Sequence, residues 1–460
     1  MCGITDVMQT ALGLAEAALA IQRRTLSPLE LVEECLRQID RWEPRLSAWV
    51  GVDREGALQT ARQVTDELAR GTVRGPLHGI PLAIKDIVDV AGFPTRAGSA
   101  LTDDHPAAED APAVARLRRA GAIILGKTVT TEFACFDPSP TRNPWNPAHT
   151  PGGSSSGSAA AVAAGMCLGA IASQTGGSIT RPASYCGVAG IKPTFGRVSR
   201  RGVMPVTFHL DHVGVMARTA ADCAALMQVI ASDDPQDQGA RLHDDFSLDE
   251  CLAQVATQRP PRLAVLRSYF FDGAEPEVAQ LTDAALGRLR EAVAEIFDVA
   301  LPDGFGEVHA MHRRVMAAEA ADFHRRAFGA PRAGYGPNMS ALLEEGFATP
   351  IADYQAALRH QHAFRQSVAR TLAGFDALVT PATPTAAPAS LASTGDPRFN
   401  SPWSFAGVPT VSIPIALVKS GLPVSLQLIG PAWSEAMLLA TSIWCERTLE
   451  FTAQPPLSAE

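Results

Sequence analysis

The stretch GIPLAIKD (residues 79–86) decides the fold class, because it has the pattern of a short buried strand that ends at a charged residue. Ile80 to Ile84 is a continuous apolar run, and Lys85 follows it directly. Such a run behind a glycine is typical of a strand that is covered on both faces. A helical pattern at Val114 to Ala120 and a second strand pattern at Ala122 to Leu125 come next. This alternation predicts an α/β layer architecture.

Further elements are expected on both sides of this stretch. Ser27 begins a capping box with Pro28 at the first helical position, and Arg54 to Arg70 repeats the helical spacing. Other helices are expected at Glu277 to Phe297 and Val308 to Phe328. Core strands are expected at Leu168 to Ser173, Phe375 to Thr380, Thr410 to Ala416 and Val424 to Ile429. No internal repeat or clear linker divides the chain.

Composition favours a large globular enzyme and disfavours several other classes of protein. Hydrophobic residues make up 46% of the 460 residues and charged residues 19%, so a sizeable core can form. The net charge is −9 and there is no long basic run, which argues against nucleic acid as the main partner. The eight cysteines include no C-x-x-C pair, which disfavours a local zinc site and suits reduced, buried thiols.

The N-terminus and the apolar runs predict a cytoplasmic protein without membrane contact. The first residues lack the basic start of a signal peptide, and Glu16 interrupts the apolar run behind them. The longest apolar run, Ala159 to Ala172, is too short to span a bilayer.

Two motif matches are rejected because their structural context is wrong. Gly121 to Thr128 fits the G-x-x-x-x-G-K-T pattern of a phosphate-binding loop, but its middle residues are apolar and strand-like. Gly153 to Gly157 fits G-x-S-x-G, the nucleophile elbow of α/β-hydrolases, which requires a strand immediately before it. The prolines at positions 144 and 147 exclude a central strand there. His312 or His360 could still complete a triad with that serine.

Three histidine pairs invite a metal interpretation that we do not adopt. None of them has an evident third ligand, so surface or hydrogen-bonded histidines are the simpler interpretation. The pairs are His209 with His212, His309 with His312, and His360 with His362.

Three segments carry residues suited to acyl-transfer chemistry. Lys85 at a strand end could be desolvated and act as a neutral base, or it could be a solvated or Asp86-paired lysine. Gly152 to Ser158 offers serine hydroxyls on a permissive backbone, or only a loop in which Ser156 or Ser158 caps a helix from Ala159. Gln174 to Pro182 places Ser178 after two glycines, with main-chain N–H groups that could hold an oxyanion, or forms a plain turn.

In order and spacing these segments closely resemble the amidase-signature family of serine hydrolases. The likeness is strong from Leu77 to about Arg218 and resumes at Asp376 to Pro381 and Gly421 to Gly430. The resemblance implies a catalytic Lys85, a bridging Ser154 that follows a cis peptide bond, and a nucleophilic Ser178. It also implies an oxyanion hole from the main-chain N–H groups of Thr175, Gly176, Gly177 and Ser178, with no metal or organic cofactor.

The resemblance also leads to expectations for the whole chain. We expect residues 1–460 to form a single amidase-signature domain with a mixed, mostly parallel central sheet sandwiched between helices. Its expected parts are a helical N-terminal portion (1–70), a signature core (75–218), a variable helical portion (235–350) and C-terminal core strands with a helix (375–460). The substrate pockets are expected around Phe133 to Arg142, His309 to Tyr335 and Phe399 to Phe405.

Departures from the family pattern bear on the substrate. Many members have aspartate before the Thr-Gly-Gly-Ser motif and arginine two residues after its serine, where this chain has Gln174 and Thr180. Arg181, one place later, resembles the malonamidase-like branch, in which such an arginine grips a substrate carboxylate. A structural ion pair is the other interpretation of Arg181.

The function expected from this resemblance is hydrolysis of the C–N bond of a small-molecule amide through an acyl-enzyme. Carbamate (urethane) or ester hydrolysis with the same three residues is the first alternative. A role as the amidotransferase component of a tRNA-dependent complex is an alternative of another class. The expected partner is a small-molecule amide or carbamate, with no nucleic acid and no membrane, and a homodimer is compatible with the sequence.

Overall fold

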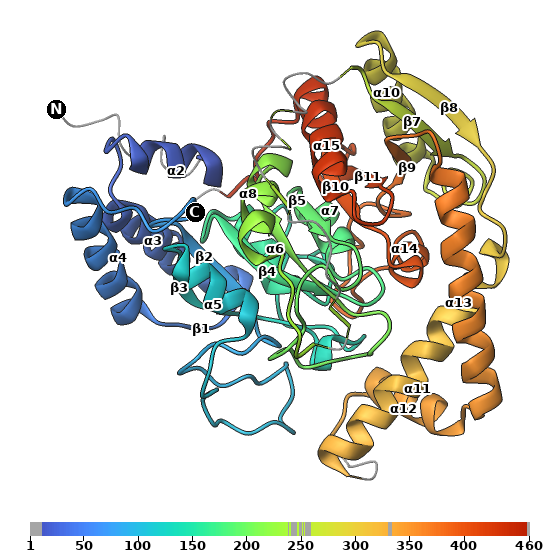
Figure 1. Ribbon diagram of the computed structural model, residues 1–460, viewed down its shortest axis with the longest axis horizontal. Helices are drawn as coiled ribbons and strands as arrows, with labels where there is room; N and C mark the ends of the chain where they lie inside the picture. Colours follow the sequence, from blue (N-terminus) through green and yellow to red (C-terminus); the bar gives the residue numbers. More distant parts are fainter. Residues whose placement is uncertain are drawn as a thin grey trace.

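The centre of the computed structural model is a twisted sheet that runs through the whole molecule (Figure 1). The structure describes residues 12–237, 239–240, 246–247, 251, 253, 259–329 and 334–457. Within this part of the chain the sheet has 11 strands in the order β1-β3-β2-β4-β6-β5-β10-β11-β9-β7-β8. The strands are β1 (Trp49–Val52), β2 (Pro81–Lys85), β3 (Ile123–Thr128), β4 (Gly169–Gln174), β5 (Ala189–Lys192), β6 (His212–Ala217), β7 (Arg262–Leu266), β8 (Glu295–Val299), β9 (Ala377–Pro381), β10 (Thr410–Leu417) and β11 (Pro423–Ile429).

The predicted α/β fold with one large mixed sheet between helices is confirmed, but the expected balance of strand directions is wrong. β2 pairs in parallel with β3 and β4, and β7 pairs in parallel with β8 and β9. The other six neighbouring pairs among the described strands are antiparallel. The strands near Lys85 are joined by the helical crossovers that parallel pairing needs, whereas short connections such as the one from β10 to β11 favour antiparallel pairing.

Both faces of the sheet are buried along its central strands, and the alternation of side chains along these strands shows this. Successive strand residues point to opposite faces. In β2, Leu82 and Ile84 belong to one apolar cluster while Ala83 belongs to the other. In β6, Val213 and Val215 likewise lie opposite Met216. A strand buried on both faces must be apolar throughout, which explains the continuous run before Lys85.

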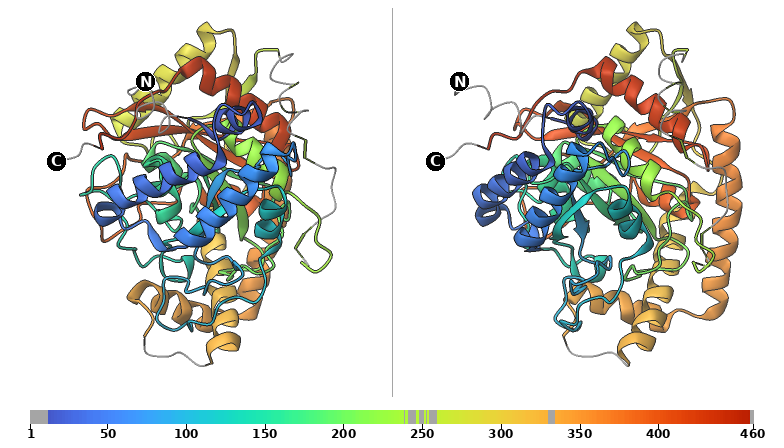
Figure 2. Two further views of the ribbon diagram at one scale, coloured as in Figure 1. Left: turned by 90° about the vertical axis from the view of Figure 1, so that its left-hand side faces the viewer. Right: turned by 60° about the vertical axis from the view of Figure 1, so that its left-hand side comes forward.

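The N-terminal helices lie side by side at one end of the sheet in all three views (Figures 1 and 2). They are α2 (Leu14–Gln22), α3 (Pro28–Leu46) and α4 (Arg54–Ala69). The predicted capping box of α3 is confirmed, because Ser27 Oγ accepts from the Glu30 N–H (3.1 Å) and Glu30 Oε2 accepts from the Ser27 N–H (2.9 Å).

The helices around the core occupy both faces of the sheet. They are α5 (Pro112–Arg119), α6 (Ser156–Ala163), α7 (Thr180–Cys186), α8 (Ala220–Ile230), α10 (Pro276–Glu291), α14 (Ser401–Ala406) and α15 (Glu435–Leu449). The helix expected from Glu277 to Phe297 ends at Glu291, and its last residues belong to β8. Five strands, β1, β5, β6, β7 and β8, were not predicted from the sequence.

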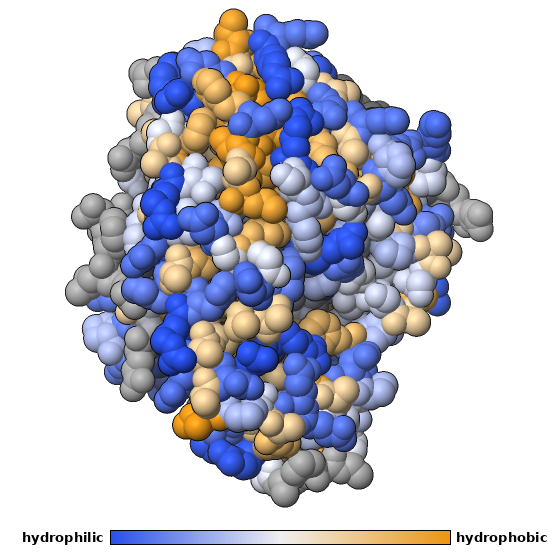
Figure 3. Space-filling view, turned by 90° about the vertical axis from the view of Figure 1, so that its right-hand side faces the viewer, coloured by the Kyte–Doolittle hydropathy of each residue, from blue (hydrophilic) through white to orange (hydrophobic). Residues whose placement is uncertain are grey.

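Three helices project from the sheet at the lower right of Figure 1: α11 (Val308–Phe328), α12 (Pro337–Ala348) and α13 (Ile351–Leu372). The bounds predicted for α11 are confirmed. Figure 3 shows the face of the molecule on this side, where apolar side chains gather in the upper part among hydrophilic ones. β8 is one of the two edge strands of the sheet, and Phe297 within it is 40% exposed.

The seven cysteines within the described residues are buried and no disulfide joins any two of them, in agreement with the prediction of reduced thiols. Residues 1–11, which include Cys2, lie outside the described part of the chain. The prediction that the N-terminus has no signal peptide concerns these residues. Among the described helices, none combines the length and the apolar character needed to cross a membrane.

Candidate active site

Lys85 is the last residue of β2 and is completely buried. Its Nζ donates to Ser154 Oγ (2.7 Å) and to Ser173 Oγ (2.8 Å). Burial lowers the pKa of this amine to about 7, and the Asp211 carboxylate opposes that shift. The solvated and Asp86-paired interpretations of Lys85 therefore do not hold, since Asp86 pairs with Lys127 (3.0 Å) instead. A neutral Lys85 can accept a proton near neutral pH.

Ser154 lies in the loop before α6, directly after a cis peptide bond between Gly153 and Ser154. The loop is held close to the sheet because the backbone of Gly157, in the first turn of α6, packs directly against the backbone of Ala48 and Val129. A Cβ at Gly157 would lie 2.2 Å from the Ala48 carbonyl oxygen and 2.5 Å from the Val129 nitrogen. No side chain can be accommodated there without displacing main chain, so the position of Ser154 is tied to the register of the neighbouring strand.

The helix cap expected at Ser156 or Ser158 is wrong. α6 begins at Ser156, three residues earlier than predicted, and its N-cap residue Ser155 makes no side-chain cap bond. Ser156 Oγ instead donates to the Gly152 carbonyl (2.9 Å), and Ser158 Oγ is 2.8 Å from Thr128 Oγ1. These serines support the loop and the strand behind it.

Ser178 stands in the loop between β4 and α7 and is 8% exposed. The three carbonyl groups before it are all engaged. The Thr175 carbonyl accepts from His312 Nε2 (3.0 Å), the Gly176 carbonyl from Ser404 Oγ (2.8 Å), and the Gly177 carbonyl from the Arg181 N–H (3.0 Å). By contrast, the N–H groups of Gly176, Gly177 and Ser178 have no acceptor within the described residues. Unpaired main-chain donors of this kind can hold a developing oxyanion.

A pocket of about 250 Å³ opens beside Ser178. The segments expected to shape it do line it, because Phe136, Met316 and Ser401 come from the three variable stretches named above. Its walls combine apolar and charged groups. The lining residues that carry charge or can carry it are Arg181, His309, His312, Arg313, Asp396 and Arg398.

Arg181 lines this pocket although it is 4% exposed. Its Nη2 donates to the Gly153 carbonyl (2.7 Å) and to Thr394 Oγ1 (3.1 Å), and its Nη1 donates to the Gly395 carbonyl (3.1 Å). Its Nε is buried without a partner in the described structure. No described carboxylate forms an ion pair with Arg181, and burial lowers the pKa of its guanidinium. The interpretation as a structural ion pair therefore finds no partner among these residues.

Three contacts at this site were not predicted from the sequence, although His312 and Ser404 lie within the segments expected to shape the pockets. Ser173 is the next-to-last residue of β4, and its Oγ accepts from Lys85 Nζ. His312 and Ser404 reach the loop of Ser178 from α11 and α14. A serine five positions before Ser178 could have been noticed as facing the same sheet edge as Lys85. His312 and Ser404 carry no such signal, because their contacts join positions more than 130 residues apart.

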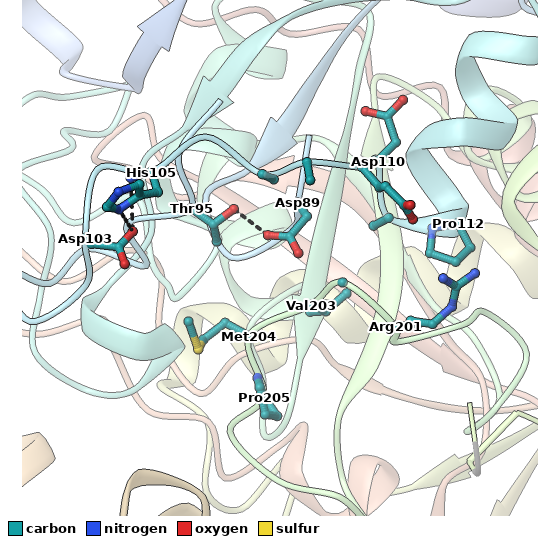
Figure 4. A pocket seen from close by; sticks show the side chains of 15 residues that line it. Asp89, Thr95, Asp103, His105, Asp110, Pro112, Arg201, Val203, Met204 and Pro205 are labelled. Atoms are coloured by element: carbon teal, nitrogen blue, oxygen red, sulfur yellow. Dashed lines mark hydrogen bonds and ion pairs between the residues drawn. The ribbon is translucent and has the colours of Figure 1, made fainter. Parts of the chain in front are cut away.

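Two further cavities lie outside the Ser178 pocket. One, of about 640 Å³, is lined by Asp89, Asp110 and Arg201 among others, and Figure 4 shows Asp89 bonded to Thr95 (2.7 Å). The other, of about 220 Å³, is also lined by Thr175 and includes Ser173 and Asp211. In the described residues no group of histidine, cysteine and acidic side chains is arranged to hold a metal ion.

The rejected motifs and the histidine pairs have other roles in the structure. Gly121 to Thr128 contributes β3, as expected, and is not a phosphate-binding loop. His309 stacks on Tyr269 and bonds to its hydroxyl (2.7 Å). His312 and His360, the two histidines considered for a triad, bond to the carbonyl groups of Thr175 (3.0 Å) and Gly304 (3.0 Å), and within the described residues neither bonds to Ser154.

The chain is similar to known proteins along nearly its whole length. The family model described as Amidase matches residues 30–439. The chain is 34% identical to a glutamyl-tRNA(Gln) amidotransferase subunit of Lachnospira eligens, over 91% of this chain and 94% of that protein. It is 36% identical to a Mycobacterium bovis protein named as the putative amidase AmiD, over 93% of this chain and 92% of that one. The structure of peptide amidase from Stenotrophomonas maltophilia superposes with a TM-score of 0.84 at 31% identity, covering 96% of this chain and 98% of that one.

Proposed function

This chain belongs to the amidase family, and we propose that it hydrolyses the C–N bond of a small-molecule amide through an acyl-enzyme formed on Ser178. The observation that carries the proposal is the bond between the buried Lys85 Nζ and Ser154 Oγ (2.7 Å), beside a pocket that Ser178 lines. A lysine desolvated in this way is neutral often enough at neutral pH to serve as a base.

In the proposed reaction the proton moves along Lys85, Ser154 and Ser178. Lys85 takes the proton of Ser154 while Ser154 takes that of Ser178, and Ser178 Oγ forms a bond to the carbonyl carbon. The carbonyl electron pair moves to oxygen, which accepts hydrogen bonds from the N–H groups of the loop. The proton returns through Ser154 to the departing nitrogen as the C–N bond breaks. Water then attacks the acyl-enzyme by the same relay and releases the acid.

The oxyanion donors in this proposal are the main-chain N–H groups of Thr175, Gly176, Gly177 and Ser178. Their support is the loop geometry, in which three successive carbonyl groups are held by other donors and the N–H groups of Gly176, Gly177 and Ser178 remain available within the described structure. Fixed donors stabilise charge that develops in the transition state without reorganisation during the reaction.

We further propose that Arg181 recognises a carboxylate on the substrate, as in the malonamidase-like branch that the motif resembles. A buried guanidinium without an ion-pair partner is costly, and a bound carboxylate would supply the missing charge. Three of its five N–H protons already donate to Gly153, Gly395 and Thr394. The two protons that remain free are one on Nη1 and the one on Nε. They lie on different sides of the guanidinium, so a substrate carboxylate can form only a single charged hydrogen bond with Arg181 unless Thr394 moves.

A hydrolysis panel tests this assignment. Malonamate-like acids, neutral aryl amides, carbamates and esters are offered to the unmodified chain and to Arg181→Ala. We expect Arg181→Ala to lose far more activity on the acids than on the neutral amides. Arg398→Ala is the matched control, because Arg398 lines the same pocket but pairs with Asp396 (3.3 Å). An equal loss on acids and neutral substrates removes the carboxylate contact from the proposal, whereas preference for carbamates or esters selects the alternative with the same three residues.

A second candidate function is that of an amidotransferase component that acts only in a complex. The observation that favours it is the 34% identity with the glutamyl-tRNA(Gln) amidotransferase subunit over nearly the full length of both chains. Turnover of a simple amide by the purified chain separates the two functions, since a component that acts only in a complex gives no turnover by itself.

A further inference from the structure

We propose that His312 and Ser404 are positioning residues that hold the loop of Ser178 in the orientation needed for oxyanion binding. This inference rests on the proposed function and assigns a role to two residues outside the segments that carry the family resemblance. His312 comes from α11 and Ser404 from α14, and both donate to carbonyl groups of the loop.

The planarity of the peptide group explains how these bonds act. In a trans peptide the C=O of one residue and the N–H of the next point in opposite directions. The bond from His312 Nε2 to the Thr175 carbonyl (3.0 Å) therefore directs the Gly176 N–H away from His312. The bond from Ser404 Oγ to the Gly176 carbonyl (2.8 Å) directs the Gly177 N–H in the same manner.

These hydrogen bonds from outside the loop matter because a glycine residue does not restrict its own backbone dihedral angles. Gly176 and Gly177 can adopt many conformations, so the direction of their peptide groups must be set by contacts. The His312 ring also packs against the loop, since a Cβ at Gly176 would lie 3.7 Å from His312 Cε1. Thr175 is held a second time, through the bond from its Oγ1 to Asp211 (2.6 Å).

The protonation state of His312 follows from its partner. A carbonyl oxygen can only accept, so Nε2 must carry the proton. Burial lowers the pKa of His312 to about 4, and the bond to Thr175 opposes that shift. The ring is therefore a neutral donor throughout the neutral range, and its bond does not titrate where Lys85 does.

The test compares substitutions that differ only in the donor they offer. The amide nitrogen of glutamine can take the place of Nε2, asparagine is one methylene shorter, and leucine has no donor. We expect His312→Leu and His312→Asn to lower kcat by about 10- to 100-fold with KM nearly unchanged, because misdirected donors act on the transition state. His312→Gln should retain most of the activity. Activity is measured with 4-nitrophenyl acetate as the substrate. Phenylboronic acid is used as an inhibitor, because it forms a tetrahedral adduct with a serine hydroxyl. Its affinity for each variant should fall in proportion to kcat.

Two controls make the result decisive. His324→Leu removes another buried, neutral histidine of the same helix, which bonds to Tyr335 (3.0 Å) and not to the loop, so its kcat should stay near that of the unmodified chain. Ser404→Ala tests the second bond independently of α11 and should also lower kcat without raising KM. Should His312→Leu fail to fold, His312→Asn, His312→Gln and Ser404→Ala still decide the question.

The inference is overturned if His312→Leu keeps its kcat, if glutamine and leucine lose activity equally, or if KM rises in place of a fall in kcat. Failure of the proposed function gives a different result. In that case Ser178→Ala keeps its activity or the unmodified chain has none, whatever residue stands at position 312.

Discussion

At the scale of single residues, the proposed chemistry depends on removing Lys85 from water. The amine is completely buried and donates to two hydroxyl groups, Ser154 Oγ and Ser173 Oγ. Neither acceptor carries a charge, so burial is poorly compensated and the neutral form of the amine gains population. The same side chain on a solvated strand end would be protonated and unable to act as a base.

This environment predicts the pH dependence of the reaction. The pKa of Lys85 is lowered to about 7, so the active, neutral form is lost as the pH falls through that value. We expect kcat/KM to fall about tenfold per pH unit below the pKa and to level off above it. The measurement is a pH–rate profile of the unmodified chain.

Lys192 provides the matched control for that profile. It is also buried, with a pKa lowered to about 7, but it donates to the carbonyl groups of Pro193 and Val408. Lys192→Met should keep the midpoint of the rising limb even if its overall activity falls. If the midpoint moves in Lys192→Met, the titration belongs to Lys192 and its assignment to Lys85 is wrong.

Loss of the base itself should be severe. Lys85→Ala should lower kcat/KM by about 10²–10⁴-fold, the range that general base catalysis contributes. Circular dichroism and thermal unfolding show whether the variant is folded. Activity within a few-fold of the unmodified chain would contradict the role of Lys85.

Some residues of the site could be predicted from the sequence and others could not. Lys85 and Ser154 were expected together and lie in contact, whereas their roles and that of Ser178 stay predictions. Each belongs to a local pattern of glycines, hydroxyls and strand ends that carries its own chemical signal. His312 and Ser404 reach the site only through the tertiary fold, and a histidine or serine within a helix has no such signal, whereas Ser173 in β4 could have been noticed from its place near Ser178.

At the scale of elements, β2 and β3 are joined at the site by a buried ion pair. Asp86 follows β2 and lies 3.0 Å from Lys127 of β3, and neither side chain is exposed by more than 2%. Burial raises the pKa of Asp86 and lowers that of Lys127, and their mutual attraction opposes both shifts. Removing one partner leaves a buried charge without compensation.

Lys127→Met should therefore lower the free energy of unfolding by about 3–5 kcal/mol, while the double variant with Asp86→Leu should lose less. Urea denaturation measures both. Arg325→Ala is the control, since Arg325 pairs with Asp322 (3.0 Å) on the exposed side of α11 and should leave the midpoint nearly unchanged. Equal losses in the single and double variants would contradict an energetic link between the two strands.

Element boundaries were predictable where a local signal marks them. The capping box at Ser27 and the apolar period of Val308–Phe328 determine their helices directly. The predicted start of α6 was wrong because each residue from Ser155 to Ser158 is suited to a helix cap. The close contacts of Gly157 with Ala48 and Val129 fix the position of the first turn, and the local sequence does not reveal these contacts. The first three residues of β8 fall within a predicted helix because an exposed edge strand shows no alternation of apolar residues.

At the scale of the whole molecule, the class of fold was predictable but the strand directions were not. Apolar runs between helical segments indicate a sheet covered on both faces, and the 11-stranded sheet of the described residues confirms it. Direction depends on which strands become neighbours. β5, for example, pairs with β6 and β10, the latter more than 200 positions away, and no local pattern reports such a pairing.

The self-sufficiency of the chain is a prediction at this scale. Because Lys85 contacts Ser154 and the pocket beside Ser178 is lined by residues of this chain, we expect the purified chain to release ammonia or amine from a simple amide without a partner. Amine release measured across a range of protein concentrations is the test. Activity that appears only when a second protein is added would favour the amidotransferase-type function.

The most direct test of the central claim is to identify the atom that becomes acylated. The chain is treated with a fluorophosphonate, which reacts covalently with activated serine hydroxyls, and the modified peptide is sequenced by tandem mass spectrometry. We expect one adduct, on Ser178, that is absent from Ser178→Ala and forms far more slowly in Lys85→Ala. An adduct on Ser154 or Ser173, or undiminished labelling of Ser178→Ala, would contradict it.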